Sequence, residues 1–350
     1  MISRENFGEL DGRRISLWTL DNGQMRFQAT EYGAILTAIF LPDGAGGSID
    51  ITPGFSTLED YVKRNSPFFG ALVGRYANRV SNAGFTLNGI NHKLDANDGP
   101  HTLHSGFQGY HQKIWQAEPF TTKDGDGIKF TRLSPSGEQG FPGNVELEVS
   151  YILNNKNEII LCYHAEAGAP TPINLTNHVY FNLKGQGSKE IAGHIARIPA
   201  ARRLETDGDL IPTGRIIPVE NTVFDFRAAR ALGENFNDGA LNIMKGGYDV
   251  CYCYDPPENT GDGLTLMAEV REPESGRSVT CRSNQCCMQL YTGCSLNMKG
   301  GKNGAAYPKF SAFCLETQHY TNAPNIPAFP AQIIKPGSCY DAVTVYGFCW

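Results

Sequence analysis

Two polar residues in strand-like segments form a candidate pair for moving protons. His178 lies in the segment Asn174-Leu-Thr-Asn-His-Val-Tyr-Phe-Asn-Leu183, and Glu316 lies far downstream in Phe313-Cys-Leu-Glu-Thr-Gln-His-Tyr320. Imidazoles and carboxylates are the side chains that most often serve as general acids and bases. Only the fold can bring the two together, because they are distant in the chain. We interpret them as a metal-free acid and base pair.

Five further polar residues suit a ligand that carries several hydroxyl groups. Their amide, imidazole, guanidinium and carboxylate groups supply the donors and acceptors that hold a polyol or a sugar. The chain has no activated-serine motif, no P-loop and no dinucleotide fingerprint. Sugar recognition is therefore the favoured interpretation. The five residues are Asn78, Arg79, His104, Asp249 and Gln289.

The elements that must position these residues are mostly strands. Runs rich in β-branched and aromatic residues recur between Gly, Asn, Asp and Pro, and several alternate apolar with polar residues, which predicts antiparallel sheets with one buried face. Helical patterns occur at 58–65 and 227–232, but they do not alternate with strands as βαβ units do. The expected fold is all-β, a large antiparallel β-sandwich with few short helices. The strand-like runs are 25–29, 35–40, 145–152, 158–163, 288–291 and 342–346.

Composition narrows the class of protein. The chain has 350 residues, 41% hydrophobic and 19% charged, which fits a globular protein with a large core. No low-complexity linker divides it, so we expect one domain spanning 1–350. The formal net charge of -6 argues against nucleic acid or an anionic membrane as the partner and is compatible with a small neutral ligand. The oligomeric state is left open as monomer or homodimer.

The amino-terminal residues bear on the expected location. They carry charge where a signal peptide needs an apolar stretch, and no run of about 18 apolar residues occurs in the chain. We therefore expect a soluble, cytoplasmic protein.

Ten cysteines raise the question of disulfides or metal binding. Most fall in the second half of the chain without a repeated spacing. Cys286-Cys287 and Cys251-Tyr-Cys253 are close pairs, but neither belongs to the paired C-x-x-C pattern of structural zinc sites. His101 and His104 have an H-x-x-H spacing with no obvious third ligand nearby. We expect reduced, largely structural thiols and no metal, while a zinc or redox role for the close pairs stays an alternative.

The polar segments, taken in order, resemble the aldose 1-epimerase, or galactose mutarotase, family. The resemblance runs from Phe7 to Tyr340, with the segments in the family order. One such segment alone is weak evidence, whereas six in order are highly specific. The six segments are Asn78-Arg79, His104-Ser-Gly106, Asn177-His-Val-Tyr-Phe-Asn-Leu183, Gly247-Tyr-Asp249, Gln289-Leu-Tyr-Thr-Gly293 and Leu315-Glu-Thr-Gln-His319.

The resemblance implies a galactose mutarotase-like sandwich with a sugar in an open cleft on one concave sheet. It implies that Glu316 is the general base at the C1 hydroxyl and that His178 is the general acid at the ring oxygen O5. The implied substrates are free hexoses such as galactose and glucose, and ring opening, rotation and reclosure interconvert their α and β anomers. No cofactor is needed, because no net oxidation occurs. The residues matched to sugar binding are Asn78, Arg79, His104, Asp249 and Gln289.

Ordinary pKa values favour these roles. Glutamate titrates near 4.3 and histidine near 6.5, so an ionised Glu316 would stand beside an imidazole that a negative neighbourhood keeps protonated. An aromatic residue, Tyr180 or Phe107, is expected to cover the apolar face of the sugar.

Two departures from the family pattern lie next to the proposed site. Ser105 stands where a glycine commonly follows the matching histidine, and Thr321-Asn322 replaces the usual Pro-Asp. We expect these changes to affect substrate preference more than chemistry.

Two alternative functions stay open. One is an epimerase for a phosphorylated hexose or another sugar, although Arg79 is the one cation in the site segments and a phosphate calls for more. The other is a sugar-binding β-sandwich without turnover, which would have no need for Glu316 and His178.

Overall fold

The computed structural model describes residues 1–254 and 263–350. In this part of the chain, every ladder between the strands named below is antiparallel, and the strands form three larger sheets and four two-stranded pairs. The predicted all-β class is confirmed.

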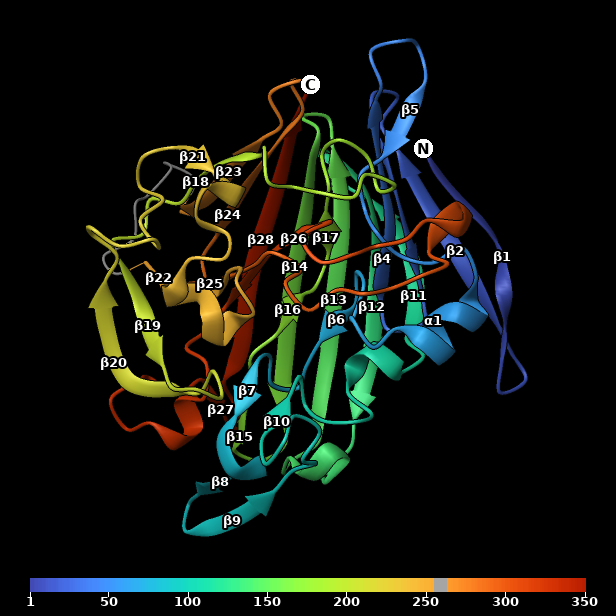
Figure 1. The fold of residues 1–350 in the computed structure, drawn as a ribbon. Coiled ribbons are helices and arrows are strands. Elements are labelled where there is room, and N and C mark those ends of the chain that lie inside the picture. Colours follow the sequence, from blue (N-terminus) through green and yellow to red (C-terminus); the bar gives the residue numbers. More distant parts are fainter. Residues whose placement is uncertain (255–262) are drawn as a thin grey trace.

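The largest sheet supplies one layer of a sandwich. Its long central strands lie side by side in Figure 1 and alternate buried with less buried residues, as predicted for runs 145–152 and 158–163. Its strands in spatial order are β11 (Gln116–Thr121), β12 (Gly125–Ser134), β13 (Val145–Asn154), β14 (Glu158–Ala167), β28 (Cys339–Cys349), β24 (Ser278–Ser283), β23 (Thr265–Arg271), β18 (Ile195–Arg197) and β21 (Arg230–Ala231).

A six-stranded sheet packs against the largest sheet. The Tyr346 hydroxyl on β28 donates to the carbonyl oxygen of Leu315 at 2.7 Å, and both residues belong to the main hydrophobic core. Burial between facing sheets is the main force that holds such a sandwich together. In spatial order the strands of this second layer are β17 (Tyr180–Phe181), β26 (Phe313–Gln318), β25 (Cys287–Tyr291), β22 (Asp249–Cys253), β19 (Arg202–Thr206) and β20 (Pro212–Pro218).

A five-stranded sheet and four short pairs complete the strands of the described residues. The five strands follow one another as a meander and add Trp18 and Leu41 to the main core. They are β1 (Ile2–Leu10), β2 (Arg13–Asp21), β3 (Arg26–Thr30), β4 (Ile35–Pro42) and β5 (Ser48–Asp50). The pairs are β6 (Leu72–Val73) with β16 (Thr176–Asn177), β7 (Arg79–Val80) with β10 (Thr102–Leu103), β8 (Gly84–Leu87) with β9 (Ile90–Lys93), and β15 (Thr171–Pro172) with β27 (Ile333–Ile334).

Helical structure is sparse, as predicted. Helix α1 (Leu58–Arg64) begins after Thr57, whose side-chain oxygen accepts a hydrogen bond from the Asp60 N–H at 3.2 Å. None of the helices in the described residues is long and apolar enough to cross a membrane. Single 3₁₀ turns lie at Ser81–Ala83, Tyr110–Gln112, Glu138–Gly140, Leu232–Asn235, Gly239–Met244, Lys302–Gly304 and Ala323–Asn325.

The helix predicted at 227–232 is wrong. Arg230 and Ala231 form β21 and pair with β18, where Ala231 lies opposite Ile195. Leu232 is fully buried in the main core and begins a 3₁₀ turn. The alanine-rich run favours a helix, but sheet pairing and burial override that weak local preference.

Candidate active site

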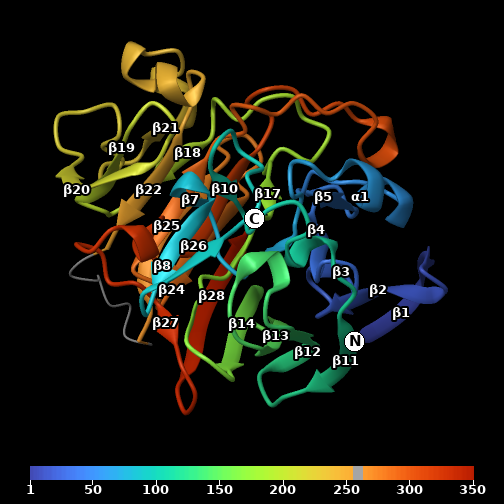
Figure 2. The same cartoon turned by 90° about the horizontal axis from the view of Figure 1, so that it is seen from below.

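A cavity of about 350 Å³ lies over one face of the six-stranded sheet. Strands β22, β25 and β26 supply part of its lining, and β7 and the loop after β10 supply another part (Figure 2). All seven residues singled out from the sequence line this cavity. They are Asn78, Arg79, His104, His178, Asp249, Gln289 and Glu316.

Strand alternation aims three of these residues into the cavity. Gln289 lies directly opposite Glu316 in the β25–β26 ladder, and both line the cavity, whereas their neighbours Leu290 and Leu315 lie in the main core. Successive side chains of a strand point to opposite faces of its sheet. The same alternation on β22 brings Asp249 to the cavity side. The apolar–polar order of these short strands therefore fixes where the polar groups point.

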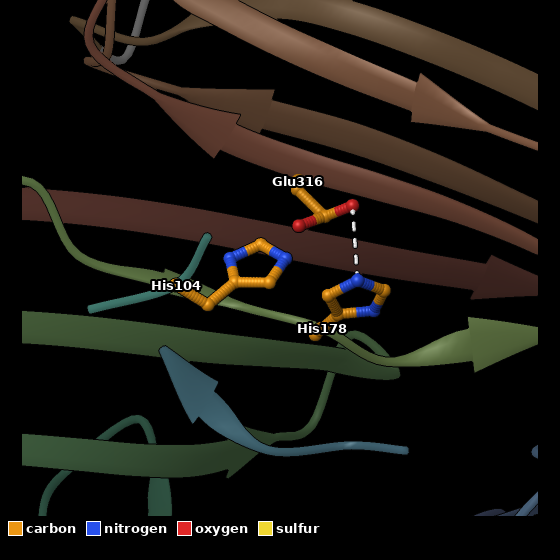
Figure 3. A group of neighbouring side chains, drawn as sticks. All are labelled: His104, His178 and Glu316. Carbon is orange, nitrogen blue, oxygen red and sulfur yellow. Dashed lines mark ion pairs between the residues drawn. The ribbon is translucent and has the colours of Figure 1, made fainter. Parts of the chain in front are cut away.

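His178 reaches the cavity from a short connection between β16 and β17. Its backbone is held on both sides, since its N–H donates to the carbonyl of Ala71 at 2.9 Å and its carbonyl accepts from Gly70 at 3.0 Å. The imidazole stacks on Tyr180 with ring centroids 5.0 Å apart. Its Nδ1 lies 3.5 Å from the sulfur of Cys314. These contacts leave Nε2 directed toward Glu316 (Figure 3).

The imidazole and the carboxylate meet inside the cavity wall. Nε2 of His178 lies 3.6 Å from Oε1 of Glu316, and the two residues are 5% and 2% exposed. Among the described residues, the buried Oε2 of Glu316 has no hydrogen-bond partner, and neither has Oε1 of Gln289. An unpaired buried acceptor costs about 1–3 kcal/mol. The site thus presents acceptors that a bound hydroxyl can satisfy.

His104 is held as a neutral donor. The Asn78 N–H donates to its Nδ1 at 3.2 Å, and the His104 N–H donates to the Asn78 carbonyl, also at 3.2 Å. Since Nδ1 accepts, the neutral ring carries its proton on Nε2. Burial lowers the pKa of His104 well below its usual value, and nearby His178 and Arg79 lower it further. This ring can donate a hydrogen bond to a ligand oxygen.

Arg79 is fixed between two carboxylates. Its Nε donates to Asp98 at 2.9 Å, and its Nη1 lies 3.8 Å from Asp249. The Gln289 side-chain N–H donates to the other oxygen of Asp249 at 2.5 Å. Guanidinium, carboxylate and amide groups thereby form one network on the cavity wall, with directions suited to a polyol.

Burial sets the protonation of the His178 and Glu316 pair. It lowers the pKa of His178 to about 4. It also raises the pKa of Glu316 well above its usual value, with the negative charge of Asp249 adding to the rise and Arg79 opposing it. Desolvation disfavours the charged form of each group. The expectation that a negative neighbourhood keeps the imidazole protonated is therefore wrong for the unliganded cavity, where burial favours the neutral imidazole.

Sequence reasoning missed several lining residues. Asp98 lies in a turn just ahead of His101, and this closeness to a candidate segment was the available signal. Phe68 and Lys245 also line the cavity from segments that carried no signal in the sequence. Of the two aromatic candidates, Tyr180 lines the cavity, whereas the side chain of Phe107 is 61% exposed and does not.

The residues at the two departures from the family pattern make hydrogen bonds within the protein. The Ser105 hydroxyl accepts from the Tyr76 N–H at 2.7 Å and donates to the Tyr76 carbonyl at 3.1 Å. Asn322 accepts from the Ser81 N–H at 3.0 Å, and Thr321 accepts from the Gln318 side chain at 2.9 Å. None of Ser105, Thr321 and Asn322 lines the cavity, so direct contact with a sugar is not their role.

The site also meets a distance criterion for metal ligands. One ligand atom each of His104, His178 and Glu316 lies within 4.8 Å of the others. Two histidines and a glutamate are a known zinc ligand set. His101 is not part of this group in the described residues. Its Nδ1 accepts from the Asn82 N–H at 3.1 Å, and its Nε2 lies 3.5 Å from Asp209.

Comparison with known proteins shows the family to which the chain belongs. A family model described as aldose 1-epimerase matches residues 16–347. Galactose mutarotase from Sus scrofa is 39% identical over 99% of this chain and 98% of its own length. The human galactose mutarotase is 38% identical over the same shares. The aldose 1-epimerase of Escherichia coli K12 is 31% identical over 97% of this chain and 96% of its own length.

Solved structures agree with these matches. An aldose epimerase homologue from C. elegans has a TM-score of 0.85 at 27% identity, over 95% of this chain and 98% of that one. A galactose 1-epimerase from Lactobacillus acidophilus has a TM-score of 0.86 over 100% and 98%, and at 22% identity it shows the fold alone. The fold is thus that of the aldose 1-epimerase class. The chain belongs to the aldose 1-epimerase family, which confirms the resemblance seen in the sequence.

Proposed function

We propose that this protein is a mutarotase that interconverts the α and β anomers of free aldohexoses such as galactose and glucose. Relatives named galactose mutarotase and aldose 1-epimerase support the mutarotase function. The observation that carries the residue assignment is the buried, unpartnered Oε2 of Glu316 beside the imidazole of His178. A sugar hydroxyl is the donor that this oxygen lacks.

Two proton transfers are sufficient for the reaction. Glu316 removes the proton of the C1 hydroxyl while His178 protonates O5, so the C1–O5 bond breaks and an open-chain aldehyde forms. Rotation about C1–C2 followed by the reverse transfers closes the ring with the other configuration. Each proton-transfer group typically contributes about 10²–10⁴-fold, and holding both against one sugar adds a proximity contribution.

The pair needs one proton in every step. The pair has two forms that hold the same number of protons. One is a carboxylate beside an imidazolium, and the other is a carboxylic acid beside a neutral imidazole. Transfer of one proton across the 3.6 Å contact converts one form to the other. Sugar hydroxyls that donate to Glu316 stabilise its carboxylate and move the proton to His178. This sets the pair for ring opening without uptake of a proton from solvent.

Burial favours the same protonation state that accompanies the open-chain sugar. After ring opening, Glu316 is a neutral acid and His178 is a neutral base. The lowered pKa of His178 and the raised pKa of Glu316 favour that state. The low exposure of the site therefore favours the protonation state of the intermediate over that of the closed-ring complex.

The binding residues serve the remaining hydroxyls. His104 donates from Nε2, Asp249 accepts, Gln289 supplies its unpartnered Oε1, and Arg79 donates. Asn78 fixes His104 through the two hydrogen bonds between them. The cavity volume of about 350 Å³ lies at the low end of the range for ligand pockets, which suits a small ligand such as a monosaccharide.

The charge of the cavity disfavours a phosphorylated sugar. Lys245 joins Arg79 in the lining, but Asp98, Asp249 and Glu316 line it too. Arg79 is already paired with two of these carboxylates. An additional phosphate would therefore meet no excess of positive charge.

The partner and location are inferred from charge and from the ligand. A net charge of -6 favours a neutral small molecule over nucleic acid or an anionic membrane. We infer a cytoplasmic protein that acts as a monomer or homodimer, since the residues assigned to the reaction all lie within one chain.

Freshly dissolved single anomers test this proposal. Proton NMR follows the anomeric signals of α-D-galactose, α-D-glucose and galactose 6-phosphate after addition of protein. We expect faster equilibration of the two free hexoses and little effect on the phosphate. Tight sugar binding without any acceleration would instead indicate a binding protein, and preference for the phosphate would contradict the free-hexose assignment.

A further inference from the structure

Four thiols form one cluster on the sheet that carries the proposed sugar site. The sulfur of Cys287 lies 3.8 Å from that of Cys286 and 3.9 Å from that of Cys253. The thiol of Cys251 also hydrogen-bonds with Cys287. All four are free cysteines. The two close pairs noted in the sequence therefore come together around Cys287.

The register of the sheet places this cluster next to the acid and base pair. Cys251 lies opposite Gln289, which lies opposite Glu316 in the next ladder. Cys253 and Cys287 lie opposite each other two residues further along the same strands. Because side chains two residues apart share a face, Cys251, Cys253 and Cys287 continue the face that lines the sugar cavity.

Cys286 differs from the other three thiols. It is partly exposed, whereas the other three are buried. Nδ1 of His319 lies 3.5 Å from its sulfur. A hydrogen bond with Cys287 and then the contact with His319 lower the pKa of Cys286 to about 5, against the effect of burial. The titratable groups facing it are Cys251, Cys287, His319, Tyr76 and Tyr340.

The arrangement of the sulfurs favours disulfide chemistry over metal binding. A tetrahedral metal site requires ligand atoms that are all close to one another. In the described part of the chain, the groups of ligand atoms that are mutually within 4.8 Å do not include these cysteines. Cys287 instead contacts sulfurs that are not mutual neighbours. That is the geometry in which a disulfide can pass from one sulfur to the next.

We propose that Cys286 is a site of oxidation by hydrogen peroxide, that Cys287 and Cys253 end as a disulfide, and that this disulfide weakens sugar binding. The last part rests on the proposed function, because it concerns the same cavity. The first two parts stand on the thiol cluster alone.

The proposed steps balance in atoms and electrons. The Cys286 thiolate attacks peroxide, the O–O bond breaks, and a sulfenic acid and hydroxide form. The Cys287 sulfur then displaces the sulfenic oxygen, which leaves as water with the proton of the Cys287 thiol, and the Cys286–Cys287 disulfide forms. The Cys253 sulfur next attacks the Cys287 sulfur and releases the Cys286 thiolate, while the proton of the Cys253 thiol neutralises the hydroxide formed in the first step. Overall, two thiols are oxidised and peroxide is reduced to two waters.

The geometry of the sheet permits the final disulfide. Residues directly opposite each other in an antiparallel pair have Cα atoms about 4.5–5.5 Å apart, which lies within the range of about 4.4–6.8 Å seen in disulfides. Closing the bond brings the sulfurs of Cys253 and Cys287 from 3.9 Å to about 2.05 Å. Drawing the Cys253 and Cys287 side chains together changes the packing on the face of β22 and β25 that also carries Asp249 and Gln289, which are bonded to each other.

Peptide mapping of the intact protein tests the chemistry. Reduced protein is treated with hydrogen peroxide, alkylated and analysed by mass spectrometry. We expect a Cys253–Cys287 disulfide in wild type and none in Cys286→Ser, whose reduced form should keep wild-type mutarotation. A sulfenic or sulfinic acid at Cys286 without a disulfide would overturn the proposal, and so would equal disulfide formation in Cys286→Ser.

Alkylation rates test the assignment of Cys286. At pH 6, Cys286 should react with iodoacetamide about tenfold faster than exposed Cys339, because its larger thiolate fraction outweighs the lower nucleophilicity of its thiolate. The carboxylate of Asp341 raises the pKa of Cys339, which makes it a suitable internal control. His319→Asn should slow Cys286 at pH 6 and restore its rate near pH 9. Faster reaction of Cys339 at pH 6 would overturn the assignment.

Calorimetry tests whether the disulfide weakens sugar binding separately from whether the protein binds sugar at all. Galactose should bind severalfold more weakly to oxidised wild type than to reduced wild type, and equally to both preparations of Cys286→Ser. Unchanged affinity in protein that carries the disulfide would overturn the coupling. Failure of the reduced protein to bind galactose would count against the proposed function, while the disulfide itself is judged by mass spectrometry.

Discussion

Nε2 of His178 lies 3.6 Å from Oε1 of Glu316, although the two residues come from different segments of the fold. His178 is held by the backbone of Gly70 and Ala71, and Glu316 is held by the ladder between β25 and β26. Both side chains are buried, so their pKa values move in opposite directions. Burial thus favours a neutral imidazole and a protonated carboxyl group, and the following predictions depend on these two shifts.

The pH profile of kcat/KM should report the unliganded pair. Below about pH 4, His178 takes up a second proton and no base is left. Above the raised pKa of Glu316, the pair loses its proton and no acid is left. We therefore expect the acid limb of kcat/KM near pH 4, below the ordinary pKa of histidine, and the alkaline limb above the ordinary pKa of glutamate in a polarimetric assay. An acid limb centred near 6.5 would contradict the effect of burial on His178.

Asp249→Asn should weaken sugar binding and shift the high-pH limb of the pH profile of kcat/KM. The variant loses the carboxylate that raises the pKa of Glu316, so activity should be lost at a lower pH than in wild type. Loss of a charged hydrogen-bond acceptor typically costs about 1.5–3 kcal/mol, or about ten- to a hundredfold in kcat/KM.

Asp98→Asn is the matched control for that change. Asp98 also pairs with Arg79, but it is not among the groups that shift the pKa of Glu316. Its pH profile should keep the wild-type alkaline limb. Equal displacement of the limb in both variants would show that disturbance of Arg79, and not the charge of Asp249, is responsible.

Glu316→Gln should stabilise the protein at neutral pH. The folded pKa of Glu316 is raised above the unfolded value of about 4.3, so wild type loses stability as pH rises from that value toward the folded pKa. Glutamine does not titrate. Urea unfolding should show that the stability of the variant relative to wild type increases between pH 4 and pH 7. A gain that is the same at both pH values would contradict a buried, ionisation-resistant carboxyl group.

Removal of metal ions should not change the rate. His104, His178 and Glu316 satisfy a distance criterion for a metal site, but the two proton transfers require no Lewis acid. Protein dialysed against a strong chelator should retain full mutarotation. Loss of activity that added zinc restores would instead assign these three residues to a metal.

The sequence predicted the residues of the site better than their protonation. Strand alternation and the order of the polar segments indicated the seven residues that line the cavity. The pKa shifts depend on burial by Phe68 and Tyr180, which pack beside His178, and local sequence gives no measure of that. Lys245 and Asp98 were missed because they reach the cavity through loop geometry.

In the fold, too, the sequence predicted what depends on local pattern and missed what depends on tertiary contacts. The runs at 145–152 and 158–163 became β13 and β14, because alternation of apolar residues reports directly on sheet faces. The run at 227–232 became strand and 3₁₀ turn, since pairing with β18 and the burial of Leu232 are tertiary effects. The influence of Ser105 on substrate preference stays a prediction, and its hydroxyl bonds the backbone of Tyr76.

The most direct test of the account is the loss of optical rotation by fresh α-D-galactose in the presence of wild type, Glu316→Gln and His178→Asn. Circular dichroism and urea unfolding confirm that each variant is folded. We predict that wild type accelerates the change, that each substitution lowers the rate by about 10²–10⁴-fold, and that the double variant is little worse than either single one. Wild-type activity in either single variant would contradict the assignment of Glu316 and His178 as the acid and base pair.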